Sequence, residues 1–288
     1  MDTRPIGVFD SGLGGLTAVR QLRRVLPGED IIYFGDTGRV PYGSRGREII
    51  RQYARQDIRF LLSHDVKFII AACGTVSSTY PPEEAARLPV PFTGVVGATA
   101  RAAVDATRNG KVGIIGTAAT VRSGSYAAVI KDMKPETEIV ARACPLFVPL
   151  AEEGWFDGPI AEGVVSRYLE PLFEKSPAPD CLVLGCTHYP MLAAAIRKVV
   201  GPEVHIVDSA ATTAEVVKRR LADKGLAHPQ AGRTGRIRFF ITDDPQRFTR
   251  TGSLFLNMTI TDSDVRLVDL ENVPLPDAAE TPTQRKSS

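Results

Sequence analysis

The sequence predicts an α/β fold with mainly parallel sheets flanked by helices, and three observations indicate it. Short apolar runs alternate with helix-length amphipathic segments along most of the 288 residues, a pattern typical of βα units. The runs are short and rich in β-branched residues, as buried parallel strands are. Phe68–Thr75 and Cys181–Thr187 are also similar, since each is an apolar run that ends in a small residue, a cysteine and then a threonine. This similarity predicts two related lobes, each with a cysteine at the end of a strand.

Each predicted strand is a short apolar run, and each predicted helix has apolar residues at helical spacing. The first pair is a strand over Ile6–Phe9 and a helix over Leu16–Leu26, with apolar residues at positions 16, 19, 22 and 26. The same criteria give, in chain order, strand Ile31–Phe34, helix Arg45–Leu62, strand Val66–Ala71, helix Thr99–Thr107, strand Val112–Ile115, helix Val121–Lys131, strand Glu138–Ala141, helix Pro159–Phe173, strand Cys181–Leu184, helix Leu192–Val200, strand Val204–Val207 and helix Thr212–Asp223.

The end of the chain differs in composition. Arg236–Ile241 and Val265–Val268 are predicted strands on either side of a short helix at Pro245–Arg250. From Asn272 onward the sequence is rich in proline, serine and charged residues and poor in apolar ones. Residues 272–288 are therefore predicted to form a disordered tail.

The overall composition excludes several classes of protein. Hydrophobic residues make up 43% and charged residues 24% of the chain, which is typical of globular proteins and excludes global disorder. The formal net charge is only +2, which argues against a basic surface for nucleic acid or for an anionic membrane. No apolar run reaches the roughly 18 residues of a membrane-spanning helix, and the first residues lack the apolar core of a secretory signal. We therefore expect a cytoplasmic protein.

Four cysteines are too few and too irregularly spaced for a disulfide framework, and they lack the Cys-x-x-Cys spacing of structural zinc sites. Cys73 and Cys186 each come just after a predicted strand, where α/β proteins bind their ligands. Backbone N–H groups that open the next helix are expected to lower the pKa of such a thiol. These two cysteines are therefore the candidate catalytic residues, whereas Cys144 and Cys181 are interpreted as core packing.

The segment Asp10–Thr17 follows the first strand and opens a helix. It matches the dinucleotide-binding fingerprint only weakly, because Thr17 stands where that motif needs glycine or alanine. An acid and a hydroxyl at a strand end, Asp10 and Ser11, suit the ammonium group of a small zwitterion better than a pyrophosphate. The alternative is a tight glycine turn in which Asp10 or Ser11 caps the helix.

Further polar candidates follow later strands. The loop Gly35–Ser44 could present backbone N–H groups and a hydroxyl to a carboxylate, and Thr117 and Thr120 could do the same. An ordinary connection is the alternative for these segments. Glu152 could equally be a solvated surface acid, and His188, two residues after a candidate cysteine, could assist that thiol or simply be hydrogen-bonded.

Together these segments resemble the glutamate racemases of the cofactor-independent amino-acid racemase superfamily. The resemblance runs in order over about residues 6–256, and its most specific string is Gly-Cys-Thr-His-Tyr-Pro at residues 185–190. The matching segments are Ile6–Thr17, Tyr33–Thr37, Pro41–Gly43, Ala72–Cys73, Ala143–Pro149 with Glu152, Leu184–Pro190, and Phe239–Thr242 with Pro245 and Phe248.

The resemblance implies an isomerase that racemises D- and L-glutamate without pyridoxal phosphate or metal and that supplies D-glutamate for peptidoglycan synthesis, and thus for cell-wall biogenesis and cell shape. Cys73 and Cys186 would face opposite sides of the substrate Cα, with Asp10 supporting the first thiol and Glu152 and His188 the second. The residues implied to hold the substrate are Asp10, Ser11, Pro41, Tyr42, Gly43, Gly74, Thr75, Thr117, Thr120, Thr187 and His188.

The resemblance also implies two similar lobes, formed by residues 1–97 plus 208–271 and by residues 98–207, with the active site in the cleft between them. Members of the family are commonly homodimers. One position departs from the pattern, because Gly74 stands where the family usually has an asparagine. The loss of an amide donor and acceptor there concerns substrate affinity and specificity more than the reaction itself.

Inversion of a stereocentre by proton exchange needs removal on one face and delivery on the other, which two thiols of matched acidity can perform. Three alternatives remain open from the sequence. The chain could racemise aspartate or another amino acid, it could be a thiol hydrolase in which His188 is the base for one cysteine, or it could be a non-catalytic amino-acid-binding protein.

Overall fold

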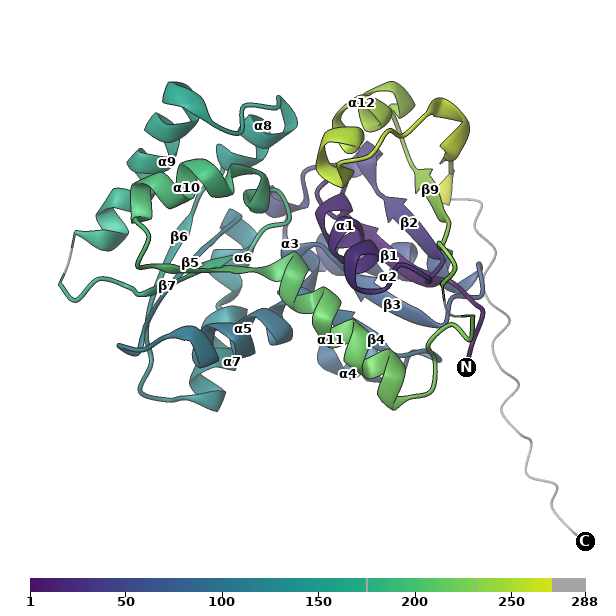
Figure 1. Cartoon of the computed structure of the whole chain (residues 1–288), viewed down its shortest axis with the longest axis horizontal. Helices are drawn as coiled ribbons and strands as arrows, with labels where there is room; N and C mark the ends of the chain where they lie inside the picture. The colour runs from purple at the N-terminus through teal and green to yellow at the C-terminus, as the bar shows by residue number, and fades with distance from the viewer. Residues whose placement is uncertain (175, 231, 271–288) are drawn as a thin grey trace, which may run out of the picture.

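The computed structural model describes residues 1–174, 176–230 and 232–270, and it contains two β-sheets with helices on their faces (Figure 1). Every strand pair in these residues is parallel, so the predicted α/β fold is confirmed. The predicted tail over residues 272–288 lies outside the described residues. Within the ranges just given, no helix is both long enough and apolar enough to cross a membrane.

The first sheet is built around the strand at the N-terminus. Its order is β10 (Val265–Leu267), β9 (Ile237–Ile241), β2 (Ile31–Gly35), β1 (Ile6–Asp10), β3 (Phe68–Ala71) and β4 (Phe92–Gly94). All residues of β1, β2 and β3 are buried, which explains why these strands are apolar on both faces. The late strands β9 and β10 return to this sheet beside β2, so the two ends of the described chain share one core.

The second sheet is formed by the middle of the chain. Its order is β6 (Glu138–Ala143), β5 (Lys111–Gly116), β7 (Cys181–Leu184) and β8 (His205–Asp208). The two central strands are buried along their whole length, whereas both edge strands are partly exposed.

Helices cover both faces of each sheet. The first sheet carries α1 (Leu16–Val25), α11 (Ser209–Asp223) and α12 (Pro245–Leu256) on one face and α2 (Arg47–Leu62) on the other. The second sheet carries α5 (Val95–Ala106) and α7 (Ser125–Met133) on one face and α8 (Phe147–Glu152), α9 (Gly158–Phe173) and α10 (Ala193–Val200) on the other. Because α11 packs against both α1 and α5, it connects the two lobes (Figure 1). The short elements are η1 (Thr37–Arg39), η2 (Tyr42–Ser44), α3 (Gly74–Ser77), α4 (Pro82–Ala86), α6 (Ala118–Ser123), η3 (Tyr189–Leu192) and η4 (Asp262–Asp264).

The structure corrects several predicted elements. The predicted helix over Val121–Lys131 is wrong as a single helix, because Gly124 takes a left-handed conformation with φ +65° and separates α6 from α7. The predicted helix at Pro245–Arg250 continues to Leu256. The short elements α3, α4, α8 and β4 were not predicted, since a segment of three to six residues carries too little periodicity to be recognised.

The division into lobes over residues 1–97 plus 208–271 and residues 98–207 stays a proposal. It is supported by the sheets, because all strands of the first sheet fall in the first lobe and the second sheet falls in the second lobe up to the last residue of β8. The boundary near residue 97 lies within α5, which begins at Val95.

A buried ion pair anchors the start of the first sheet. The side chains of Lys67 and Glu29 are 0% and 3% exposed, and Lys67 Nζ lies 2.6 Å from Glu29 Oε2. The ammonium also donates to the carbonyl oxygen of Asp2 at 2.8 Å, and the other carboxylate oxygen accepts from the backbone N–H of His228 at 2.7 Å. This pair therefore holds four segments together that are distant in sequence, around Asp2, Glu29, Lys67 and His228.

Candidate active site

A cavity of about 240 Å³ is lined by residues that follow strands of both sheets. Its wall includes most of the residues that the sequence predicted to hold substrate or transfer protons. The lining residues are Ser11, Gly12, Leu13, Val40, Pro41, Tyr42, Gly43, Ser44, Cys73, Gly74, Thr75, Thr117, Ala118, Pro145, Val148, Pro149, Glu152, Cys186, Thr187 and His188.

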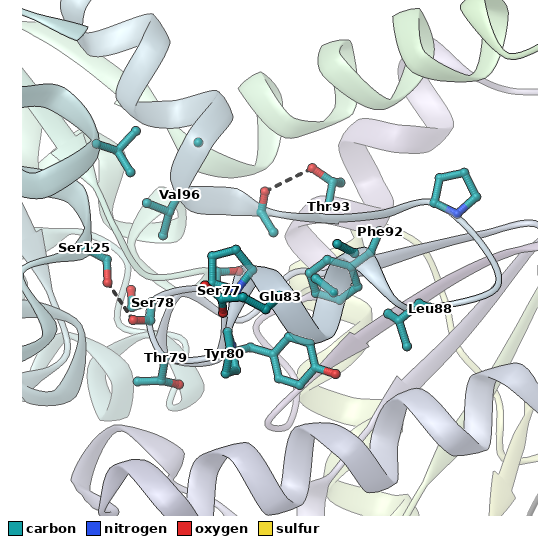
Figure 2. Close-up of a pocket in the computed structure, with 18 of the residues that line it drawn as sticks. Ser77, Ser78, Thr79, Tyr80, Glu83, Leu88, Phe92, Thr93, Val96 and Ser125 are labelled. Atoms are coloured by element: carbon teal, nitrogen blue, oxygen red, sulfur yellow. Dashed lines mark hydrogen bonds between the residues drawn. The ribbon is translucent and has the colours of Figure 1, made fainter. Parts of the chain in front are cut away.

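A larger groove of about 910 Å³ lies elsewhere, along residues 77–97 and the first turns of α7 (Figure 2). Its wall contains none of the predicted site residues. Two of its cationic side chains are already bound to backbone, since Arg51 donates to the carbonyl oxygen of Thr79 and Arg220 to that of Phe92. The smaller cavity, not this groove, is therefore the candidate active site.

Cys73 lies between the end of β3 and the first residue of α3, and it is buried. Its Sγ lies 3.6 Å from the hydroxyl of Ser11. Burial, and to a lesser extent the charge of Asp10, raises the pKa of Cys73 to about 12, against smaller opposing effects of the Val76 N–H and the Ser11 hydroxyl. An N–H group of α3 does lower this pKa as expected, but the net pKa is raised and not lowered, because α3 is only four residues long and desolvation outweighs its effect.

Asp10 ends β1 and is buried beside this thiol. One carboxylate oxygen accepts from the backbone N–H of Gly12 at 3.1 Å, while Oδ1 has no hydrogen-bond partner among the described residues. Burial raises the pKa of Asp10, although the positive charge of His188 and nearby backbone N–H groups act in the opposite direction. An acceptor that is buried without a donor is suited to an ammonium group.

Cys186 follows β7, and its thiol begins a series of hydrogen-bonded side chains that can carry a proton. Its Sγ is 3.8 Å from Nδ1 of His188, whose Nε2 lies 3.0 Å from Oε1 of Glu152. Oε2 of Glu152 accepts from Arg247 at 2.6 Å. Glu152 belongs to α8 of the second lobe and Arg247 to α12 of the first, so this chain of contacts crosses between the lobes.

The protonation states of His188 and Glu152 follow from their hydrogen-bond partners. Burial lowers the pKa of His188, but hydrogen bonds to Cys186 and Glu152 outweigh it and raise that pKa to about 10. Burial raises the pKa of Glu152, and the hydrogen bond and charge of His188 together with Arg247 lower it overall. At neutral pH the pair is therefore an imidazolium and a carboxylate.

The predicted hydroxyl residues form a connected group at the cavity. Thr75 and Thr117, from different lobes, lie 3.0 Å apart between hydroxyl oxygens, and Thr117 lies 3.0 Å from Thr120. Thr120 itself is buried behind this wall and does not line the cavity, so its predicted role in binding can only act through Thr117. Thr187 lines the cavity next to His188 Nδ1, at 3.5 Å.

Pro41, Tyr42 and Gly43 all line the cavity, and the hydroxyl of Tyr42 is bonded to two buried acids behind it. It donates to Asp36 and lies 3.2 Å from Oδ2 of Asp57, both of which are fully buried. The side chain of Tyr42 therefore anchors the loop to the first lobe, and the implied role of Tyr42 in holding substrate stays a proposal that concerns its backbone.

The sequence did not reveal the residues that hold the predicted site residues in place. Arg247 is a half-exposed residue on a surface helix, and nothing in its neighbourhood in sequence marks it. Asp36 and Asp57 were missed because each has polar or charged neighbours in the sequence, which is typical of a solvated acid, although the structure buries both completely. In the described part of the chain, no three His, Cys, Asp or Glu residues are grouped so that they could hold a metal ion.

The raised pKa of His188 predicts a specific pH dependence of stability. A group whose pKa is higher in the folded than in the unfolded protein stabilises the fold fully at pH values below its unfolded pKa, here about 6.5. This stabilisation is lost as the pH rises through the folded pKa of about 10. The free energy of unfolding of the wild type minus that of His188→Gln is therefore expected to shrink between pH 6.5 and 10. Urea unfolding across this range measures it, and a constant difference would contradict the assignment of the imidazolium.

Comparison with known proteins gives consistent matches. A family model described as Asp/Glu/Hydantoin racemase matches residues 16–217. The glutamate racemase of Geobacter metallireducens is 45% identical over 271 residues, which are 94% of this chain and 98% of that protein. The structure of glutamate racemase from Francisella tularensis in complex with D-glutamate has a TM-score of 0.86 at 37% identity, covering 94% of this chain and 99% of that chain. That of glutamate racemase from Thermus thermophilus in complex with β-chloro-D-alanine has a TM-score of 0.84 at 45% identity, with the same coverage.

Proposed function

Because this chain belongs to the Asp/Glu/hydantoin racemase family, we propose that it is an isomerase that interconverts L-glutamate and D-glutamate by proton transfer between two cysteines. The observation that carries the proposal is that Cys73 and Cys186 line one cavity while following strands of different sheets. Glutamate is favoured over aspartate because relatives that are 42–46% identical over most of the chain are glutamate racemases.

In the proposed reaction, one sulfur acts as thiolate and removes the proton from Cα, which gives an S–H bond and a carbanion. The other sulfur, as thiol, delivers its proton to the opposite face of Cα and becomes the thiolate. Atoms and charge balance, and the reverse reaction uses the same two groups with their roles exchanged. Two groups on two faces avoid any rotation of the intermediate in the site.

The surroundings of each thiol support distinct roles. Cys73 has a pKa of about 12, so its thiol is protonated at neutral pH and can donate its proton. A substrate ammonium beside Asp10 would supply the positive charge that this side of the cavity lacks. On the other side, the imidazolium of His188 lies 3.8 Å from the Cys186 sulfur and can exchange a proton with it, while Glu152 holds the ring in place.

The carbanion is the costly species, and its charge must be met by donors that are already oriented. We assign the ammonium to Asp10 and Ser11. The carboxylates are assigned to the hydroxyls of Thr75, Thr117 and Thr187 and to backbone groups of Pro41–Gly43 and Gly74. The site needs neither pyridoxal phosphate nor a metal in this proposal.

The proposal also includes the role of the product in the cell and the oligomeric state of the protein. D-glutamate made here would supply peptidoglycan synthesis in the cytoplasm and so contribute to cell-wall biogenesis and cell shape. We also propose that the protein works as a homodimer. Exposed apolar side chains, among them Trp155 at 51% and Leu254 at 48%, support a contact with a second copy.

The test is proton NMR of D- and of L-glutamate with the protein in deuterated water, together with circular dichroism of each enantiomer. The expected result is loss of the α-proton signal and decay of the optical signal to zero from either side. Loss of the α-proton signal of aspartate, without loss of that of glutamate, would show that aspartate is the substrate instead. Thermal stabilisation by glutamate without exchange would indicate a binding protein, and a covalent acyl-enzyme seen by mass spectrometry would indicate a thiol hydrolase.

A further inference from the structure

The segment Cys186–His188 of the second lobe rests on the first turn of α1, which belongs to the first lobe. Thr17 lies in that turn and is 1% exposed. Its hydroxyl lies 2.8 Å from the carbonyl oxygen of Gly14 and 3.0 Å from that of Thr187. The Gly14 carbonyl already accepts from the backbone N–H of Thr17 at 3.0 Å, so the hydroxyl hydrogen is available to Thr187. Because Thr187 stands between the cysteine and the histidine, this hydrogen bond ties both of them to α1.

The carbonyl group of Thr187 needs a donor from outside its own turn. Three residues further on stands Pro190, which has no N–H, and the N–H of Met191 donates to the carbonyl oxygen of His188 at 3.1 Å. Thr187 is 3% exposed, so its carbonyl oxygen without a donor would carry the cost of a buried unsatisfied acceptor. The Thr17 hydroxyl therefore supplies a hydrogen bond that this turn cannot make for itself.

Gly14 makes a second contact with the same segment. A Cβ atom added to Gly14 would lie 2.2 Å from Oγ1 of Thr187 and 2.4 Å from Nδ1 of His188. The imidazole has little freedom to give way, because its Nε2 lies 3.0 Å from Glu152 and its ring packs edge-on against Phe255, with centroids 5.2 Å apart. A side chain at position 14 would therefore displace the histidine or the threonine before it.

We propose that Thr17 is a positioning residue whose hydroxyl, together with the backbone of Gly14, holds Cys186 and His188 in place at the cavity. Neither Thr17 nor Gly14 lines the cavity, so both act through the segment that they support. The Cys186 sulfur lies 3.8 Å from Nδ1 of His188, and Thr187 lines the cavity, so a shift of this segment changes all three. The catalytic consequence rests on the proposed racemase function, whereas the support of the segment does not.

The test compares Thr17→Val with the wild type, with Thr17→Ser and with Thr213→Val. Valine nearly preserves the shape of threonine but removes the hydroxyl, whereas serine keeps the hydroxyl. Thr213 is the matched control, because it is also 1% exposed on a helix of the first lobe and its hydroxyl oxygen has no hydrogen-bond partner among the described residues. Hydrogen–deuterium exchange, followed by mass spectrometry of peptides, measures the opening of each segment independently of activity.

The backbone N–H groups of Tyr189 and Met191 report on the segment directly, since they donate to the carbonyl oxygens of Cys186 and His188. In Thr17→Val, a peptide that contains these groups is expected to exchange at least about fivefold faster, the effect of losing one buried hydrogen bond of ordinary strength. Peptides from the central strands β2 and β5 should exchange as in the wild type. Thr17→Ser and Thr213→Val should match the wild type throughout.

Activity gives the second readout. The kcat of Thr17→Val for glutamate is expected to fall at least about tenfold in both directions, because His188 and the Cys186 sulfur lose the geometry that proton transfer needs. Thr17→Ser and Thr213→Val should keep the wild-type kcat. An equal loss of kcat in the serine and valine variants would show that the hydroxyl is not what matters at position 17, and it would overturn the proposal.

The outcomes separate the two proposals. If the wild type racemises nothing, the racemase function fails, but faster local exchange in Thr17→Val still supports the positioning role. Unchanged exchange of the Tyr189–Met191 peptide in a folded Thr17→Val protein would refute that role, whatever the activity. If exchange rises in every peptide, Thr17→Val has unfolded, and Gly14→Ala takes its place with the same local increase expected. A Gly14→Ala protein without that local increase would then overturn the inference.

Discussion

Replacement of Cys73 or Cys186 by serine is expected to lower the rate of glutamate racemisation by at least about 10³-fold in both directions. Serine nearly preserves the size of the side chain, but its hydroxyl is far less acidic than a thiol and cannot exchange a proton with Cα near neutral pH. Because each direction of the proposed reaction uses one sulfur to remove the proton and the other to deliver it, the loss of either one is expected to block both directions. Circular dichroism started from each enantiomer measures the two rates.

The matched control is Cys181→Ala, which removes a buried thiol at the far end of β7 and is expected to keep its turnover. Thermal unfolding should show that the serine variants remain folded, since serine nearly preserves the size of the side chain and both cysteines lie at the cavity wall beyond the ends of their strands. Near-normal turnover by either serine variant would remove that cysteine from the mechanism.

The largest loss of stability is expected from Lys67→Met. This substitution leaves the carboxylate of Glu29 buried without its counter-charge, which typically costs about 3–5 kcal/mol in free energy of unfolding. The methionine fills much of the same space, so the loss reports the charge and not a cavity. Urea unfolding at neutral pH measures it.

Lys198→Met provides the comparison, because its ion pair with Glu162 is exposed and should leave the free energy of unfolding nearly unchanged. If the two variants lose the same small amount, the buried pair does not anchor the first sheet as described. Restoration of stability in the double variant Lys67→Met, Glu29→Gln would add support, since it removes the uncompensated charge.

Much of the fold is determined locally and could be predicted. Cys181–Leu184 is a strand with the predicted bounds, and Ile31–Gly35 differs by one residue, because a short β-branched run buried on both faces has few other ways to satisfy its backbone. The prediction failed where one residue changes the path, as at Gly124, whose left-handed conformation divides a helix without disturbing the apolar pattern.

The sequence by itself determined which chemistry is present and at which strand ends, since Cys73, Cys186 and His188 are all marked by the elements that precede them. Only the tertiary structure decided how these groups are held. Glu152 meets Arg247, which is 95 residues away in the chain, and the backbone of Gly74 lies close to that of Gly185. Periodicity reports the neighbours of a residue within a turn or a strand, whereas the approach of two lobes depends on the summed packing of many segments, and no local pattern contains that sum.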